Sequence, residues 1–326
     1  MMSNFIFSLN VTIPIFLMIL LGYIIRKMGI ISDGFVSAAN KYVFLVALPV
    51  MLFKDISETD VADQMTGDFL LFCMIVTIVM FLLVWLLTYL FVKDKTMVGA
   101  FAQAGVRGSA AVLGVAFVEN ICGNSGMAPM MIVAAVPFFN ILSVIILTFS
   151  ADMGKVNPAS EEERRQIRSK NIKKAFINIL KNPIILGILA GLLFSLSGLS
   201  MPAIPAKTIT YISNTATPIA LIAIGGGFDK NEALGRLKPA IAASVVKLIV
   251  LPAVFLPLAL LMKFAPSEIA AILVMLASPT TVSCYVMADN MKNDKVLTSN
   301  VILITTILSS VTLTMWVFIL KSFGAL

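Results

Sequence analysis

Ten hydrophobic segments, each close to the length of a membrane-spanning helix, constrain the fold of this chain more than any other feature. A span needs about 20 apolar residues, and lipid admits only helices or closed barrels. Only 13% of the 326 residues are charged, against about 25% in soluble domains. We therefore expect an all-α polytopic membrane protein with ten transmembrane helices. Their approximate ranges are 9–25, 36–53, 69–92, 97–118, 128–150, 182–199, 206–228, 239–262, 268–288 and 298–320.

The composition also excludes several classes of function. The chain has no histidine, and its three cysteines lack the spacing of metal ligands, so we expect no metal and no cofactor. Its basic residues lie beside hydrophobic segments rather than in a patch, so we expect no nucleic-acid partner. An intramembrane enzyme would need paired deep carboxylates or a metal cluster, and the sequence offers neither.

The distribution of Lys and Arg predicts the orientation in the membrane. Alternate loops, including the long polar break at 151–181, hold 18 of these residues, and the loops on the opposite side hold four. Because basic loops stay on the cytoplasmic side, we expect a cytoplasmic central loop, containing a solvated amphipathic helix, and both termini outside.

An internal repeat divides the chain into two halves. Segment 14–22 (PIFLMILLG) recurs as 183–191 (PIILGILAG), and Tyr42 and Pro49 fall on Tyr211 and Pro218 at the same offset. Five helices per half is an odd number, so the halves must insert with opposite topology, as in secondary transporters. We predict a first inverted repeat at 1–150, a cytoplasmic linker at 151–181 and a second repeat at 182–326.

Four stretches resemble the auxin efflux carrier family, and in particular its bacterial malonate or malate permeases. They are 22–30 (GYIIRKMGI), 40–53 (NKYVFLVALPVMLF), 215–227 (TATPIALIAIGGG) and 278–288 (SPTTVSCYVMA). The resemblance implies the fold of bile acid sodium symporters, in which helices four and nine are broken and cross near the bilayer midplane. It also implies a homodimer and, from the bacterial members, an inner (plasma) membrane location. One departure concerns helix four, where Ser109 and Ala116 stand in place of the family's Asn and Pro.

The two breaks are the predicted substrate site. An anion that leaves water can be held by free backbone N–H groups at the N-termini of half-helices. A proline interrupts the predicted ninth helix and is followed by residues with hydroxyl groups. In the predicted fourth helix, glycines and a serine mark the matching position at which the helix is expected to break. The predicted site residues here are Gly108, Ser109, Pro279, Thr280, Thr281 and Ser283; a proline kink with small residues for packing is the structural alternative.

Charged and amide side chains within the spans are further candidates. Arg107 lies deep in an apolar segment, where a charge costs about 2.5–3.5 kcal/mol, and its planar guanidinium suits a carboxylate. The alternatives are snorkelling or an ion pair with an acidic residue. Asn140 and Asn214 are candidate cavity residues. Lys247 is expected to snorkel and Asp289 to be solvated, yet both are candidates for ion coupling.

These features together favour a secondary carrier of small organic anions, mono- or dicarboxylates, that works by alternating access. Helices one, two, six and seven would form a scaffold with hinges at Pro49 and Pro218, and the other helices would move. The sequence leaves open a membrane-embedded anion sensor or a channel. It also leaves open the direction of transport and whether a proton, a sodium ion or nothing is coupled.

Overall fold

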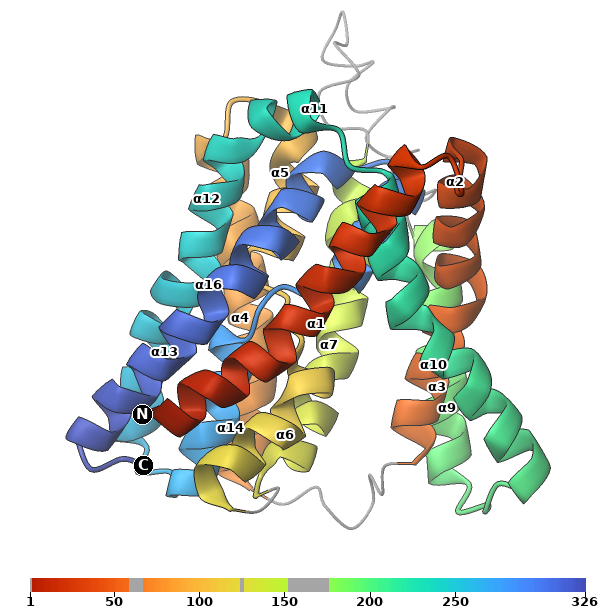
Figure 1. Cartoon of the computed structure of the whole chain (residues 1–326). Helices are drawn as coiled ribbons and strands as arrows, with labels where there is room; N and C mark the ends of the chain where they lie inside the picture. The colour runs from red at the N-terminus through yellow and green to blue at the C-terminus, as the bar shows by residue number, and fades with distance from the viewer. Residues whose placement is uncertain (1, 59–66, 124–125, 152–175) are drawn as a thin grey trace, which may run out of the picture.

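The computed structural model describes residues 2–58, 67–123, 126–151 and 176–326, and the regular elements in these ranges are helical. Figure 1 shows the helices as a tilted bundle, with both chain ends at one end and α11 at the other. Most of the predicted linker, residues 152–175, lies outside the described ranges, while residues 176–180 are helical.

The first half of the chain begins with a long helix and contains one interrupted helix. Its helical segments are α1 (Met2–Lys27), α2 (Asp33–Tyr42), η1 (Val43–Ala47), α3 (Leu48–Ser57), α4 (Asp68–Phe91), η2 (Lys95–Met97), α5 (Val98–Ala104), α6 (Ala110–Cys122) and α7 (Ala128–Ser150). Segments α2, η1 and α3 form one continuous rod.

The second half follows the same order with one extra short helix. Its segments are α9 (Pro183–Leu196), α10 (Ala203–Gly226), α11 (Lys230–Gly235), α12 (Leu237–Val245), η3 (Val246–Val250), α13 (Leu251–Leu261), α14 (Pro266–Ala277), α15 (Ser283–Asn290) and α16 (Lys295–Ser322). Here α12, η3 and α13 form one rod.

Six helical runs in the described ranges are long and apolar enough to cross a membrane. They are Asp33–Ser57, Asp68–Phe91, Ala128–Ser150, Ala203–Gly226, Leu237–Leu261 and Lys295–Ser322, and shorter apolar helices cover Pro183–Leu196 and Pro266–Ala277. Large apolar side chains such as Leu71, Leu86 and Leu90 of α4 are exposed, as lipid contact requires. The chain is a polytopic helical membrane protein.

Two wide helical turns precede prolines. The π-helical turn η1 comes before Pro49, and η3 comes before Pro252. Proline cannot donate the N–H that closes an α-helical turn, and local π geometry is one way to accommodate the loss. Pro218, by contrast, lies inside the unbroken helix α10.

The buried side chains form two main clusters. One joins α4, α5, α6, α7, α12, α13, α14 and α16. The other joins α1, α3, α9 and α10, and reaches α7 and α15. Within the second cluster α1 packs along α10, and α9 packs along α3.

Glycines allow these two helix pairs to approach backbone to backbone. A Cβ at Gly225 would overlap the carbonyl oxygen of Ile19 and lie 2.8 Å from the backbone nitrogen of Tyr23. A Cβ at Gly187 would lie 2.5 Å from the carbonyl oxygen of Pro49. Such close contact is how helices associate in membranes, where van der Waals packing replaces the hydrophobic effect.

We expect Gly225→Ala to destabilise the protein, because the added methyl forces α10 away from α1. Overpacking of this kind costs about 1–3 kcal/mol, which thermal unfolding of the purified protein in detergent would detect. Gly235→Ala is the matched control, because a Cβ there has no neighbour within 4 Å. An equal Tm for Gly225→Ala and wild type would show that the α1–α10 contact tolerates separation.

Candidate functional site

Two interrupted helices meet in the middle of the chain's fold. One interruption separates α5 from α6 at residues 105–109, and the other separates α14 from α15 at residues 278–282. The backbone N–H of Ser109 donates to the carbonyl of Pro279 (2.8 Å), and the N–H of Thr281 donates to the carbonyl of Arg107 (3.4 Å). Gly108 and Thr280 form the antiparallel bridge between them. We call these paired stretches the crossover.

The two interruptions have different local causes. Pro279 disfavours a helical conformation at Ser278, whose backbone is extended (φ −63°, ψ 151°). The fourth predicted segment has no proline, yet it is also broken, so substitution of the expected Asn and Pro has not kept the helix intact. Gly108 explains why: a Cβ there would overlap the Ser278 hydroxyl and lie 2.9 Å from the Lys247 ammonium nitrogen. The close packing of Gly108 against Ser278 therefore holds the break between α5 and α6 in place.

Arg107 is buried at the crossover, with 5% of its surface exposed. Its Nη2 donates to Oδ1 of Asn140 on α7 (2.6 Å), and its Nη1 donates to Sδ of Met287 on α15 (2.7 Å). Both partners are neutral, and no ion pair joins Arg107 to a carboxylate among the described residues. The snorkelling and ion-pair alternatives therefore do not describe this arginine, which keeps an uncompensated charge.

The hydroxyl residues of the crossover divide into two groups. Thr280 is buried, and its hydroxyl donates to the carbonyl of Ala104 (2.7 Å) while its N–H donates to Oγ1 of Thr305 (3.0 Å). It thereby caps the end of α5. Ser109 and Thr281 are partly exposed, and Thr281 Oγ1 lies 3.3 Å from Ser283 Oγ at the first turn of α15. The crossover therefore has one hydroxyl residue that holds its backbone and others that remain partly accessible.

The N-termini of α6 and α15 add to the positive potential at the crossover. Both helices begin within a few residues of the paired stretches, at Ala110 and Ser283. The unbonded N–H groups of a helix N-terminus act as about half a positive charge. With Arg107, they make the crossover suited to an anion.

The prediction that Lys247 snorkels is wrong. Its side chain is fully buried, and Nζ donates to the carbonyl oxygens of Leu276 (2.7 Å) and Met275 (3.3 Å) at the end of α14. Snorkelling requires a path to the interface, whereas the η3 turn lies against α14. The structure thus brings Lys247 to the crossover.

Asp289 is tied to neighbouring helices rather than simply solvated. One carboxylate oxygen accepts a hydrogen bond from the Asn40 amide of α2 (2.7 Å), and the other pairs with Lys295 of α16 (3.0 Å). The Asn290 amide also donates to the carbonyl of Asn40 (3.2 Å). These contacts join α2 to the end of α15, and we call them the α2–α15 latch.

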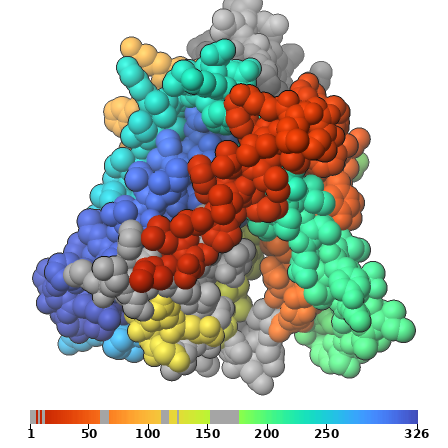
Figure 2. Space-filling view, viewed as in Figure 1, coloured from red at the N-terminus to blue at the C-terminus, as the bar shows by residue number. Residues whose placement is uncertain are grey.

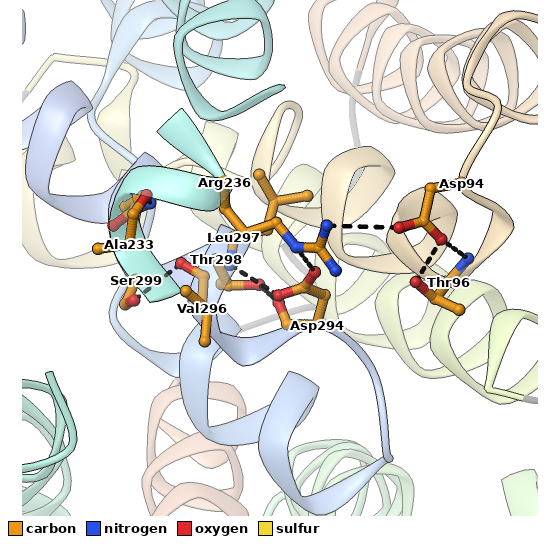
Figure 3. A network of polar contacts seen from close by, with 10 residues as sticks. Asp94, Thr96, Ala233, Arg236, Asp294, Val296, Leu297, Thr298 and Ser299 are labelled. Atoms are coloured by element: carbon orange, nitrogen blue, oxygen red, sulfur yellow. Dashed lines mark hydrogen bonds and ion pairs between the residues drawn. The ribbon is translucent and has the colours of Figure 1, made fainter. Parts of the chain in front are cut away.

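A second polar network lies at the same end of the bundle (Figure 3). Arg236 contacts Asp94 through Nη1 (3.4 Å) and Asp294 through Nε (2.7 Å). Asp94 also accepts hydrogen bonds from the hydroxyl and N–H of Thr96. The Thr96 hydroxyl, more than any other group, lowers the pKa of Asp94, so this carboxylate remains charged at neutral pH. A pocket of about 530 Å³ borders the network.

Of the other predicted residues, Asn140 lies at the crossover, and Asn214, Pro49 and Pro218 belong to other parts of the fold. Asn140 is buried and bonded to Arg107, but Asn214 lies exposed on α10. Pro49 follows the η1 turn, and Pro218 is exposed.

Sequence reasoning missed four residues that the structure places beside the predicted ones. Met287 and Gln103 contact each other next to Arg107, and Asn40 and Lys295 hold Asp289. Helical spacing could have suggested two of them, since Gln103 lies four residues before Arg107 and Met287 four residues after Ser283. Asn40 and Lys295 carry no comparable signal.

Comparison with known proteins gives consistent results along most of the chain. Residues 7–317 match the family described as "Membrane transport protein". A protein named "Putative malonate transporter" from Rhizobium meliloti is 26% identical over 97% of both chains. An "Uncharacterized transporter" from Methanothermobacter thermautotrophicus is 22% identical over 97% of this chain and 99% of the relative. The Escherichia coli K12 transporter YfdV is 27% identical over 67% of this chain and 68% of the relative.

A family match over 7–317 covers the crossover, the latch and both clusters of buried residues except Leu320. The chain is therefore a membrane transporter rather than an enzyme, and it belongs to the membrane transport protein family of the auxin efflux carriers.

Proposed function

We propose that this protein is a secondary active transporter of small organic anions, with malonate and related mono- or dicarboxylates as substrates. The observation that carries the proposal is the buried Arg107 guanidinium, whose hydrogen-bond partners among the described residues are the neutral atoms of Asn140 and Met287 named above. A guanidinium has five N–H donors and binds carboxylates in bidentate fashion. The name of the Rhizobium meliloti relative supports malonate as the first substrate to test.

We propose further that the substrate binds at the crossover, between Arg107, Ser109, Thr281 and Ser283. The partly exposed Ser109 and Thr281 mark where a ligand would reach the crossover. The first turn of α6 would supply backbone N–H donors. In α15, by contrast, the N–H groups of Cys284 and Tyr285 already donate to the carbonyls of Thr281 and Val282. Thr280 and Pro279 would hold the backbone pairing rather than touch the anion.

The architecture we propose is ten spans in two inverted repeats, covering 1–150 and 182–326. The order of elements in the two halves supports it, because an interrupted helix is the fourth rod in each. The packing supports it too, since the first rod of each half lies against the second rod of the other, α1 on α10 and α9 on α3. The cluster of α1, α3, α9 and α10 would be the scaffold.

In the proposed orientation, in a bacterial inner membrane, the end of the bundle that carries α11 is cytoplasmic. The α2–α15 latch closes this end. Figure 2 shows a hollow at the opposite end, between the yellow α6 and α7 and the orange and green α3, α9 and α10. We therefore take the structure as an outward-facing state of an alternating-access cycle, with both termini outside.

Uptake of radiolabelled malonate and malate into proteoliposomes tests the proposal. We expect saturable uptake by wild type and a loss of at least about tenfold for Arg107→Ala, because charge-assisted hydrogen bonds contribute about 1.5–3 kcal/mol. Asn140→Asp should also abolish uptake, since it places a carboxylate on the guanidinium where the substrate would bind. Arg26→Ala, which removes a cation at the end of α1, is the control.

Distinct outcomes would contradict distinct parts of this proposal. A wild type that moves neither acid would reject the dicarboxylate assignment, and normal uptake by Arg107→Ala would make the arginine structural. Accumulation above the external concentration under a pH or sodium gradient distinguishes a carrier from a channel or a sensor.

Alternating access predicts that the latch controls exposure of the crossover. In intact cells, a Ser109→Cys variant in a Cys122→Ser background should react with a membrane-impermeant maleimide, and malonate should slow the reaction. Adding Asn40→Ala removes the hydrogen bond to Asp289 and should lower the labelling rate, by at most about tenfold, because the outward-facing state loses about 1.4 kcal/mol. Asn231→Ala on the exposed α11 is the control. An unchanged rate with Asn40→Ala would show that the latch does not hold the cytoplasmic end closed.

A further inference from the structure

Lys247 occupies an unusual position for a lysine in a membrane protein. It lies in η3, is fully buried, and forms no ion pair with a described carboxylate. Its Nζ instead donates to the main-chain carbonyls of Leu276 (2.7 Å) and Met275 (3.3 Å). These carbonyls belong to the last turn of α14, which ends at Ala277.

The end of α14 presents a set of oxygens that suits a small cation. The last carbonyls of a helix have no partner within the helix and carry a partial negative charge. Next to them the Ser278 hydroxyl is buried and has no hydrogen-bond partner among the described residues. A Cβ at Gly108 would contact both this hydroxyl and the Lys247 ammonium, so the two groups lie close together at the end of α14. Half-helix C-termini and unwound carbonyls of this kind coordinate sodium ions in other transporters.

Contacts with a neighbouring helix fix the α12–η3–α13 rod in a position that keeps the Lys247 side chain at the end of α14. Pro252 cannot donate the hydrogen bond that would reach the carbonyl of Leu248 in an α-helix. The Trp316 indole of α16 donates to that carbonyl instead (2.9 Å). The wide η3 turn is thereby fixed against α16 as well as against α14, and Lys247 has a defined direction.

We infer that the Lys247 ammonium is a resident cation that takes the place of a coupling sodium ion at the end of α14. It neutralises the carbonyl end of the broken helix throughout the transport cycle, so anion transport needs no sodium. Lys247 is a positioning residue, because it contacts the α14 backbone beside the crossover and not the anion. The inference rests on the proposed function for its transport consequence, but its cation site can be measured without transport.

The first test compares sodium, potassium and choline chloride at equal ionic strength. Wild-type Tm and wild-type uptake of malonate should be the same in all three salts. In choline chloride, the Tm of Lys247→Ala should be roughly 5 °C below that of wild type. Saturating sodium should restore most of this difference. Uptake by this variant should fall at least about tenfold in choline and recover partly with sodium or with methylammonium, which fits the space vacated by the side chain.

Two further variants separate cation replacement from a packing defect. Lys238→Ala, an exposed lysine on the same rod, should show no response of Tm or uptake to sodium. Lys247→Met fills the space without a charge. Its uptake should therefore be lost, and neither sodium nor methylammonium should restore it.

Several results would overturn the inference. A saturable sodium dependence of wild-type Tm or uptake would show that the cation site is not filled by Lys247, and this result needs no folded variant. Normal uptake by Lys247→Ala or Lys247→Met in choline would show that no cation is required. If wild type carries none of the acids tested, the sodium response of Tm still decides the cation site, so failure of the proposed substrate is distinguishable.

Discussion

The structure depends on how two broken helices satisfy their backbone hydrogen bonds away from water. An unpaired amide or carbonyl in lipid costs several kcal/mol, so a break can persist only where partners replace the lost bonds. Here each break is the partner of the other, through Ser109 to Pro279 and Thr281 to Arg107. The side chain of Thr280 completes the arrangement by capping Ala104. Neither break would be stable alone, so the two halves of the chain depend on each other at this point.

The same breaks account for the two buried cations. A broken helix leaves a positive N-terminus and a negative C-terminus at the crossover. Lys247 lies on a negative end, the carbonyls of α14, and is neutralised there. Arg107 lies near the start of α6 and α15, and in the described part of the chain its guanidinium donates to an amide oxygen and a thioether. The two cations thus differ: the carbonyls of α14 compensate Lys247, whereas under the proposed function Arg107 is the cation that binds the anion.

Local sequence rules predicted the features that depend on one helix, and the family resemblance predicted that the two broken helices meet. Neither gave the side-chain contacts between neighbouring helices. The apolar segments and the break at Pro279 follow from local rules, and Arg107 and Asn140 stand out as polar residues in apolar surroundings. Their contact with each other depends on how α5 packs against α7, which no local rule gives. The wrong prediction for Lys247 shows this most clearly, because the expectation that a lysine snorkels treats its helix as isolated in lipid. In the fold, the η3 turn lies against α14, and the carbonyls of Met275 and Leu276 accept the hydrogen bonds of the ammonium group.

The short helix α15 links the proposed substrate site to the latch. Ser283 begins it at the crossover, Met287 lies against Arg107, and Asp289 near its end is bonded to Asn40. At 1.5 Å per residue its eight residues span about 12 Å, so the two sites lie at the ends of one short helix. An anion that takes Arg107 away from Met287 changes the contacts of the same helix that holds the latch closed. Under the proposed function, binding and opening are therefore coupled through α15 without any need for a longer pathway.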